Sequence, residues 1–431
     1  MFDLSDESIV WAYVENPYYQ YFCGEKVFQH TFPIDRSSMS RFRGRLKKKK
    51  LYKLLQETIK SGFKTEVIKP KSVECAVIDS TVQEKNIAYP TDAKLYYKGI
   101  ILLGKLAKGL GITLRQSYIY TGKKLLIKYS RYNHAKQFKR KAAALKKLKV
   151  RLGRVYREIL RKVEEEKIDL SLDSKTLLEQ CKRLLAQKRT SKNKLCSFHE
   201  PQTVCISKGK AHKRYEFGNK STFITTAKEC FILHADADEG NPYDGHTLKE
   251  ALNSANRTAK EILNSGIDYL FADKGYKGHG YAGDTTALFE TSANKKRHKQ
   301  LKRRASIEPV FSHTKQHHRM GRNFLKGSAG DLINTILSAC GYNLKKIYNK
   351  FKKAYKKMLS WLLFYAVWGL STPWYHISID QISGKSIWSG ICSEPNETWK
   401  FGSWGCSRST IYFRGGRRVS KLLEPFLHGS P

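Results

Sequence analysis

Two short apolar runs, far apart in the chain, are each followed by an aspartate. In "VECAVIDSTVQ" the run 73–78 precedes Asp79, and in "GIDYLFADKGYKG" the run 267–272 precedes Asp273. Such runs, bounded by polar residues, are typical of strands buried on both faces of a sheet. In open α/β sheets the functional residues gather beyond the C-terminal ends of the strands, so aspartates ending two neighbouring strands would converge. Taken singly, either aspartate is better explained as the cap of a turn.

The segments between these runs predict the fold class. "TVCIS", "RYEFGNKSTFITT" and "CFILHA" have strand patterns, and "NPYDGHTL" opens a helix that ends near Asn264. A strand, a hairpin, a helix and a strand in this order resemble an α/β core of the RNase H-like type with a mixed sheet. A long insert interrupts this core after its first strand. Apolar residues at steps of three and four from Phe138 to Val163 predict a long amphipathic helix there, and a second helix follows.

The charge of the chain indicates its partner. Lys and Arg number 80 against 38 Asp and Glu, which gives a net charge of +42. This surplus says nothing about the fold, but it favours a polyanionic partner, and nucleic acid is the obvious one. Each phosphate contact releases counterions, so binding should weaken by roughly 0.9 log units per contact for each tenfold rise in salt.

Two helical regions carry much of this positive charge. Residues 134–194 contain 20 Lys and Arg against 7 Asp and Glu, so the insertion has a strongly positive outer face that could follow a DNA backbone. Near the N-terminus, Asp35 can cap a helix that carries Arg41 and Arg43 away from its apolar stripe, as suits a helix laid against DNA. The alternative for both regions is a solvated basic face.

These patterns divide the chain into four expected regions. They are a helical N-terminal DNA-binding domain at 1–68, a discontinuous RNase H-like catalytic core at 69–92 and 200–345, a basic helical insertion at 93–199, and a C-terminal tail at 346–431.

One acidic residue, Glu308, stands alone in the basic stretch "HKQLKRRASIEPVFSHTKQHHRMGRNF". It could serve as an ion-pair partner, a helix cap or a ligand of a bound cation. With Asp79 and Asp273 it completes the minimum set for two Mg²⁺ ions, because Mg²⁺ takes only one or two protein carboxylates and completes its shell with water and phosphate oxygens. Two such ions roughly 4 Å apart can activate the attacking oxygen and stabilise the leaving one in phosphodiester displacement.

The stretch around Glu308 also carries a family signature. Arg304, Glu308 and Lys315 have the Arg-x3-Glu-x6-Lys spacing of bacterial insertion-sequence transposases of the DDE class, with Leu301 at the position of the usual tyrosine. The chain resembles this family from about Phe2 to about Lys357. Further segments that resemble it are "AVIDSTVQEKNIAYPTDAKL", "GNPYDGHTL", "ADKGYKGH" and "HRMGRNFLKGSAGDLINTILSACGYNL".

The resemblance implies a function and a site. Asp79, Asp273 and Glu308 would be the catalytic acids and bind Mg²⁺, for which Mn²⁺ would substitute. The activity would be metal-dependent strand cleavage at transposon ends, followed by transfer of the freed 3′-OH to target DNA. The partners would be transposon ends and target DNA, bound by a homodimer or larger assembly. Candidate DNA-binding residues are Arg304, Lys315, Arg319, Arg322, Arg41 and Arg43.

Other polar residues offer competing assignments. Three aspartates in "HADADEGNPYDG", Asp236, Asp238 and Asp244, compete with Asp273 for the second acidic role, although this segment is better explained as a loop and helix cap. The histidines of "SHTKQHHR" have helical spacing suited to zinc, but no thiol or carboxylate completes a set, so contact with phosphate or water is favoured.

The C-terminal region differs in composition from the rest. Six of the seven tryptophans fall between Trp361 and Trp404, and this break in composition indicates an altered reading frame or readthrough beyond the normal end. The alternative function is therefore a catalytically inactive, DNA-binding transposase remnant, and a third is a nuclease without strand joining. Residues 358–379 lack charged side chains, but Pro373 and His376 argue against a membrane helix, so no membrane is expected. Nine cysteines without a C-x-x-C pair, and an N-terminus without a signal core, predict a cytoplasmic protein.

Overall fold

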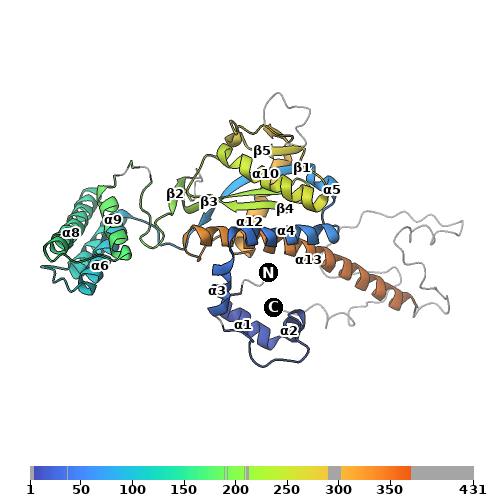
Figure 1. Ribbon diagram of the computed structural model, residues 1–431, viewed down its shortest axis with the longest axis horizontal. Coiled ribbons are helices and arrows are strands. Elements are labelled where there is room, and N and C mark those ends of the chain that lie inside the picture. Colours follow the sequence, from blue (N-terminus) through green and yellow to red (C-terminus); the bar gives the residue numbers. More distant parts are fainter. Residues whose placement is uncertain are drawn as a thin grey trace. The chain divides into compact units, whose positions relative to one another are not determined.

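The computed structural model describes residues 4–35, 37–188, 190–191, 193–207, 209, 213–289 and 302–369. It divides the chain into two compact units, Met1–Trp361 and Leu362–Pro431. Most of the predicted C-terminal tail, residues 370–431, lies outside the described residues. The first unit is a mixed α/β structure that contains the sheet and most of the helices (Figure 1).

The sheet places β1 between strands of opposite direction. Its order is β2-β3-β1-β5-β6, and β4 pairs with β3 outside this path. β1 is antiparallel to β3 and parallel to β5, and β5 is parallel to β6. The bounds are β1 Cys75–Glu84, β2 Val204–Ser207, β3 Tyr215–Thr226, β4 Ile232–Ala237, β5 Tyr269–Ala272 and β6 Thr286–Phe289.

Most predicted strands are confirmed, but one boundary was wrong. β1 does not end at Asp79; it continues to Glu84. The apolar run stops near Ile78, yet the strand continues because β3 pairs with it as far as the Glu84–Gly218 position. A side chain at Gly218 would meet the carbonyl oxygen of Gln83 at 1.9 Å, so glycine permits this close backbone approach.

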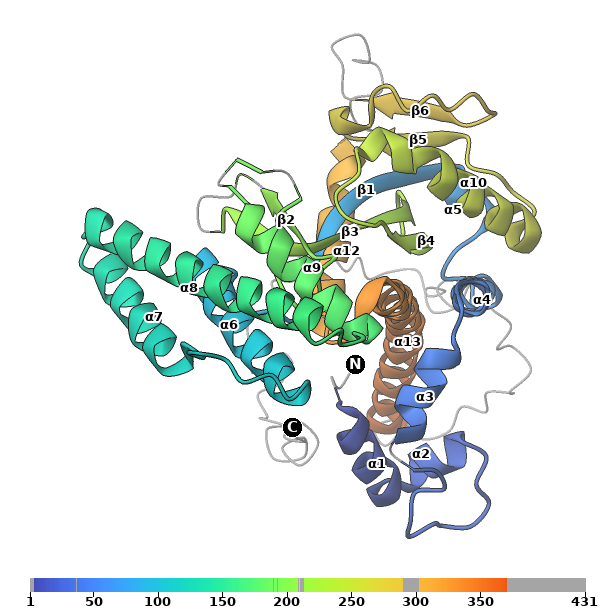
Figure 2. The same ribbon diagram turned by 60° about the vertical axis from the view of Figure 1, so that its left-hand side comes forward.

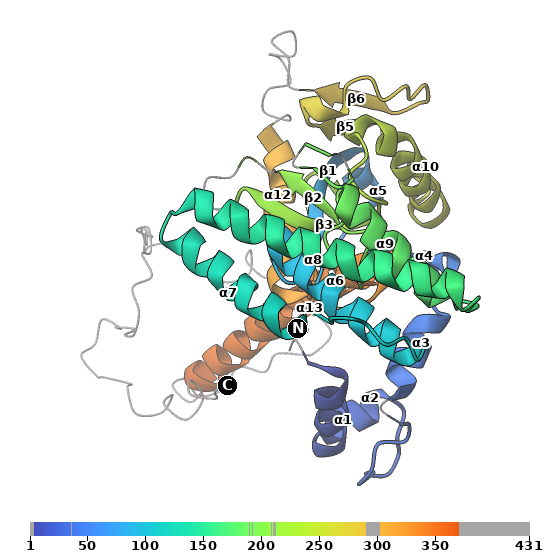
Figure 3. The ribbon, with the colours of Figure 1, turned by 90° about the vertical axis from the view of Figure 1, so that its left-hand side faces the viewer.

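Helices cover both faces of the sheet. α10 (Asp244–Leu263) packs on β3 and β4, and α12 (Ile307–His317) packs on β1. Figures 2 and 3 show these two helices on opposite faces. The N-terminal helices are α1 (Asp6–Glu15), α2 (Pro17–Phe22), α3 (Ser37–Arg45), α4 (Lys48–Lys64) and α5 (Pro70–Val73). Leu51, Leu55 and Ile59 of α4 are buried in the same hydrophobic cluster as the sheet, so the predicted region 1–68 contributes directly to the core.

The insertion after β1 forms a second hydrophobic core. Its helices are α6 (Asp92–Gly109), α7 (Ile119–His134), α8 (Phe138–Glu165) and α9 (Leu172–Ala186), which lie side by side (Figure 3). The predicted amphipathic helix is confirmed, because Leu148, Leu152 and Ile159 are fully buried on one stripe of α8. A side chain at Gly99 of α6 would approach Leu152 to 2.9 Å, so this glycine lets the two helices pack closely.

The remaining described elements lie late in the chain or are short. They are η1 (Lys274–Tyr276), η3 (Lys302–Ser306) and α13 (Gly327–Gly369). In the described part of the chain, no helix is both long and apolar enough to cross a membrane. Part of the charge-free segment considered above, residues 370–379, lies outside it. The seven cysteines in the described ranges are free thiols.

A buried ionic network joins the end of β1 to α13. The Lys85 ammonium lies 3.1 Å from Glu200 and 2.8 Å from Asp331, and these three side chains are at most 5% exposed. Asn219 and Asn323 donate hydrogen bonds to the Asp331 carboxylate, at 2.7 and 2.6 Å. Burial raises the pKa of Asp331, and Lys85 opposes this shift. The network therefore depends on one buried cation for two buried acids.

Replacing this cation should destabilise the fold in a pH-dependent way. We expect Lys85→Met to lower the free energy of unfolding by about 3–5 kcal/mol at neutral pH, because two acids are left buried without their cation. An acid whose pKa is raised in the folded state stabilises the fold when protonated, so acidification should reduce the deficit. Urea denaturation at pH 5 and pH 8 measures the difference, and Lys94→Met, at an exposed position, is the control. A deficit that does not change with pH would contradict this account.

Candidate active site

The pairing of β1 with β5 brings the two predicted aspartates to one level of the sheet. The last parallel pair in the register is Val77 with Phe271. Asp79 and Asp273 each lie two residues beyond this pair, so the same register leads to both. Asp79 is half-buried within β1, whereas Asp273 is exposed just after β5. Their carboxylates each accept a hydrogen bond of 2.7 Å from the following backbone N–H, of Ser80 and Lys274.

Glu308 lies on α12, the helix that packs on β1. It lies in the first turn of α12, where its carboxylate faces solvent. Pro309 is accommodated because it too lies in the first turn, where its missing N–H has no helical partner to lose. Ile307 and Val310 are fully buried and anchor this turn against the sheet core. Glu308 is thus an exposed acid on a firmly packed support.

The three acids come from packed elements but do not form a closed cluster. The element before α12, η3, packs against both β1 and β5. Within the ranges that the structure describes, no group of three or more His, Cys, Asp or Glu side chains is placed to hold a metal ion. This also applies to the zinc set considered for His313, His317 and His318. The structure therefore brings together the strands of Asp79 and Asp273 and leaves Glu308 on the neighbouring helix turn.

Arg304 contacts one of these acids directly. Its guanidinium lies 3.8 Å from the Asp273 carboxylate, with the two side chains 27% and 53% exposed. At this exposure an ion pair contributes little stability, on the order of 0–1 kcal/mol. It nevertheless places a phosphate-binding type of side chain at the carboxylate. η3 carries Arg304 on a separate turn before α12.

A second acid, Asp244, supports the strand next to Asp79. Ser80 donates a 2.8 Å hydrogen bond to the Asp244 carboxylate, and the Lys220 ammonium donates to the same oxygen at 3.1 Å. Tyr276, after β5, is buried beside them; burial first, and then the charges of Asp244 and Asp79, raise its pKa well above the usual range. The motif around Asp244 was visible in the sequence, and Tyr276 lies in the family-like segment "ADKGYKGH", but no pattern in the sequence pointed to Lys220.

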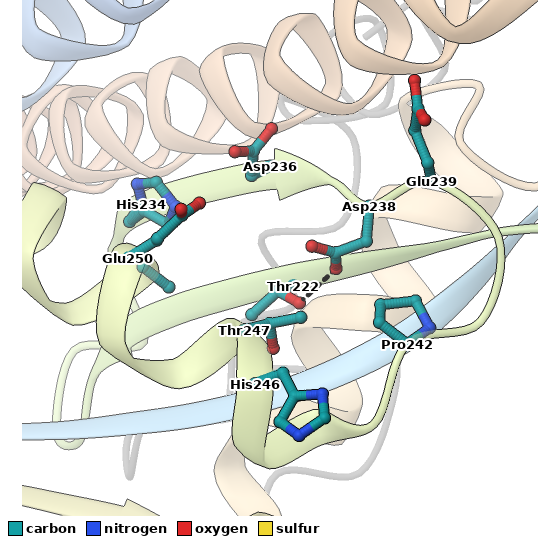
Figure 4. A pocket seen from close by; sticks show the side chains of 10 residues that line it. Thr222, His234, Asp236, Asp238, Glu239, Pro242, His246, Thr247 and Glu250 are labelled. Carbon is teal, nitrogen blue, oxygen red and sulfur yellow. Dashed lines mark hydrogen bonds between the residues drawn. The ribbon is translucent and has the colours of Figure 1, made fainter. Parts of the chain in front are cut away.

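The other competing aspartates lie in a separate acidic pocket. It has a volume of about 270 Å³ and lies at the end of β4, between β3 and α10 (Figure 4). Its lining residues are Thr222, His234, Asp236, Asp238, Glu239, Pro242, His246, Thr247, Glu250 and Ala251. None of the three predicted catalytic acids is among them. Asp236 forms a 3.1 Å ion pair with Lys48, and Asp238 accepts a 2.7 Å hydrogen bond from Thr222.

Burial sets the charge of this pocket. It raises the pKa of Asp238 to about 6 and lowers the pKa of His234 to about 4. The His234 ring, stacked on Tyr52 with 5.7 Å between centroids, is therefore neutral at physiological pH. Asp236 and Asp238 are both engaged by neighbouring side chains, which fits a structural role.

The other five predicted DNA-binding residues fall into two groups. Lys315 lies in the last turn of α12, and Arg319 and Arg322 follow it on an exposed turn, where Arg319 has a left-handed backbone conformation with φ of 57°. Arg41 and Arg43 are instead paired with acids of the N-terminal region. Arg41 lies 3.8 Å from Asp35, and Arg43 forms a bidentate pair with Asp6.

Comparisons with known proteins decide the family. Residues 173–344 match the model described as "Transposase DDE domain", and residues 1–45 match "Transposase domain (DUF772)". The chain belongs to the insertion-sequence DDE transposases. Proteins of this family act on DNA and generally use divalent metal ions. The DDE match includes Asp273 and Glu308, whereas Asp79 lies before it.

One curated protein is similar to part of this chain. The "Uncharacterized protein ORF8 in nfe locus" of Rhizobium meliloti is 46% identical over 136 residues, which cover 32% of this transposase and 66% of the relative. The transposase thus spans slightly less than two thirds of that protein. No solved structure matches it significantly.

The raised pKa of Asp238 predicts that this acid of the pocket destabilises the fold at neutral pH, and substitution of Asp238 tests this. The pKa of Asp238 is about 6 in the folded protein, against a usual value of 3.8. The neutral carboxyl group therefore stabilises the fold below pH 3.8, and this contribution is lost as the pH rises through 6. We therefore expect Asp238→Asn to raise the free energy of unfolding by about 2 kcal/mol at pH 7.5 and to have little effect near pH 4. Chemical denaturation measures this, with the exposed Asp284→Asn as control. Equal destabilisation at both pH values would refute the assignment.

Proposed function

We propose that this transposase cleaves DNA strands at the ends of its element and transfers the freed 3′-OH to target DNA. The observation that carries the proposal is the register of β1 and β5, from which Asp79 and Asp273 follow at equal distances. The sheet order also supports an RNase H-like core, because β1, β5 and β6 run parallel and β3 runs antiparallel beside β1. In this proposal the core comprises 69–92 and 200–345, with the helical insertion at 93–199.

The donor chemistry of the site fits Mg²⁺. Mg²⁺ needs one or two protein carboxylates and reserves its other positions for water and phosphate oxygens, so an open pair of acids suits it better than a closed cluster. Asp79 and Asp273 provide such a pair, and Glu308 provides a third, exposed carboxylate from α12. When bound, Mg²⁺, or Mn²⁺ in its place, would lower the pKa of the attacking water and stabilise the developing charge on phosphate.

The surrounding residues have distinct proposed roles. The Ser80–Asp244–Lys220 hydrogen bonds hold the β1 backbone beside Asp79, so that its carboxylate keeps a fixed position. Arg304 neutralises Asp273 and, with DNA bound, can turn its guanidinium to a phosphate oxygen. Lys315, about two turns after Glu308 on the same helix, binds the backbone phosphate.

DNA binding by the rest of the chain is proposed from its charge. Arg319, Arg322 and the positive face of α8 would contact phosphates without reading sequence. Arg41 and Arg43 remain predicted contacts, although each already pairs with a carboxylate. The DNA substrate implies that the protein acts in the bacterial cytoplasm.

Substitution of the three acids tests the catalytic assignment. Asp79→Asn, Asp273→Asn and Glu308→Gln should each slow nicking of the element's end sequence by about a thousandfold, since lost metal binding removes several kcal/mol of transition-state stabilisation. Each variant should still bind the DNA, because the change removes negative charge. The assay uses Mg²⁺ and Mn²⁺ and scores both nicked and joined products.

The matched controls are Asp236→Asn and Asp238→Asn in the acidic pocket, which should nick at the wild-type rate. Nicking without joined products would favour a nuclease. Tight binding by the wild type without any nicking would favour the inactive remnant, and full activity of Asp79→Asn would refute its role.

The salt dependence of DNA binding tests the phosphate contacts. Lys315→Ala and Arg322→Ala should each reduce the slope of log binding constant against log salt by about 0.9, because each removes one phosphate contact. Lys94→Ala, at an exposed position of α6, should change the slope less. Fluorescence anisotropy across a salt series measures the slopes, and slopes equal to wild type for both variants would exclude these contacts.

A further inference from the structure

The first described residues differ in charge from the rest of this basic chain. Residues 4–35 contain five acidic residues, Asp6, Glu7, Glu15, Glu25 and Asp35, and Lys26 as their one Lys or Arg. The whole chain has a net charge of +42. A segment of net negative charge repels DNA phosphates, so this part of the N-terminal region is a poor DNA-binding surface.

The same segment exposes large apolar side chains. Trp11 is 62% exposed, Tyr18 80%, Tyr21 81% and Phe22 89%, and Val27 follows at 72%. Exposed aromatic side chains gathered on two short helices are typical of a protein interface rather than of a solvated surface. Figure 1 shows these helices, α1 and α2, at the N-terminal end of the chain.

Polar contacts hold this segment in a defined shape, so the aromatic residues do not collapse inward. The Gln20 side chain is 2% exposed; it donates to the carbonyl of Tyr13 at 3.1 Å and to that of Gln29 at 2.8 Å. Tyr13 is buried and meets Phe32 edge-to-face at 5.1 Å. A preformed shape lowers the entropy cost of binding, because few side chains must be ordered on contact.

Two arginines of α3 pair with acids of the segment. Arg43 pairs with Asp6 and Arg41 with Asp35, so two acids of the segment and two bases of α3 are already matched. Hydrogen bonding with Arg43 lowers the pKa of Asp6, which keeps this carboxylate ionised. Glu7 and Glu15 remain exposed on α1 beside the aromatic residues.

We propose that residues 4–35 are a docking surface for a second copy of this chain. The partner must offer positive charge, and this chain supplies it, most densely in residues 134–194 with 20 Lys and Arg against 7 Asp and Glu. The four aromatic side chains together expose on the order of 600 Å² of surface. A stable protein interface buries about 800 Å² per partner, so they supply most of such a contact.

The proposal concerns assembly and needs neither DNA nor metal. Its outcome is therefore independent of whether the protein cleaves DNA. Charge complementarity between copies also predicts that association weakens as salt rises, because exposed charges are screened.

Analytical ultracentrifugation of the full chain, without DNA or metal, tests the surface. We expect the wild type to self-associate and the combined variant Tyr18→Ser, Tyr21→Ser, Phe22→Ser to have a dissociation constant at least about tenfold higher. The double variant Glu7→Lys, Glu15→Lys should also have a higher dissociation constant than the wild type. The matched control is Phe324→Ser, a 67% exposed aromatic residue outside the segment, which should associate as the wild type does.

Carbodiimide cross-linking of a mixture of isotopically heavy and light chains identifies the partner. The reagent joins carboxylates to lysines, so we expect heavy–light cross-links from Glu7 or Glu15 to lysines of the other copy. A monomeric wild type, unchanged association of both variants, or cross-links from this segment only within single chains would each overturn the proposal.

Discussion

The hydrogen-bonded pairing of β1 with β5 is the constraint on which the proposed site depends. Asp79 and Asp273 are separated by the whole helical insertion, the β-hairpin and α10, and the shared register of two parallel strands leads to both acids. On its other side β1 pairs with β3, whose antiparallel contact extends along nearly all of β1 and past the apolar run. The insertion can be long because it has its own hydrophobic core and leaves the sheet undisturbed.

The surroundings of the acidic side chains distinguish acids that stabilise the fold from acids that remain exposed. Asp331 is buried and forms an ion pair with Lys85, Asp238 is buried and has a raised pKa, and Asp6 forms an ion pair with Arg43. These acids serve the fold. Glu308 differs, because α12 is firmly packed while its carboxylate stays exposed, and a rigid support with an open acid is the arrangement that metal-dependent chemistry requires. In the proposed function this exposed acid serves as a metal ligand.

The sequence predicted the elements better than their limits and contacts. Apolar periodicity identified α8 and the short strands, because side-chain burial imposes those periods directly. It placed the end of β1 too early, since pairing with β3, not apolar character, extends that strand to Glu84. The pairing of Arg43 with Asp6 and the hydrogen bond from Ser80 to Asp244 were not predictable, because each joins residues distant in sequence. The candidate acids were predicted from strand ends and a family signature, and only the sheet register relates Asp79 to Asp273.

Metal-directed cleavage of the protein backbone tests the common site most directly. Fe²⁺ substituted for Mg²⁺, with ascorbate and peroxide, generates radicals that cut the chain next to the bound ion. We predict cuts near Asp79, Asp273 and Glu308 together, all suppressed by excess Mg²⁺ and all lost in Asp79→Asn. Cuts confined to the acidic pocket of Asp236 and Asp238, or cuts near Asp273 that persist in Asp79→Asn, would contradict a shared metal site.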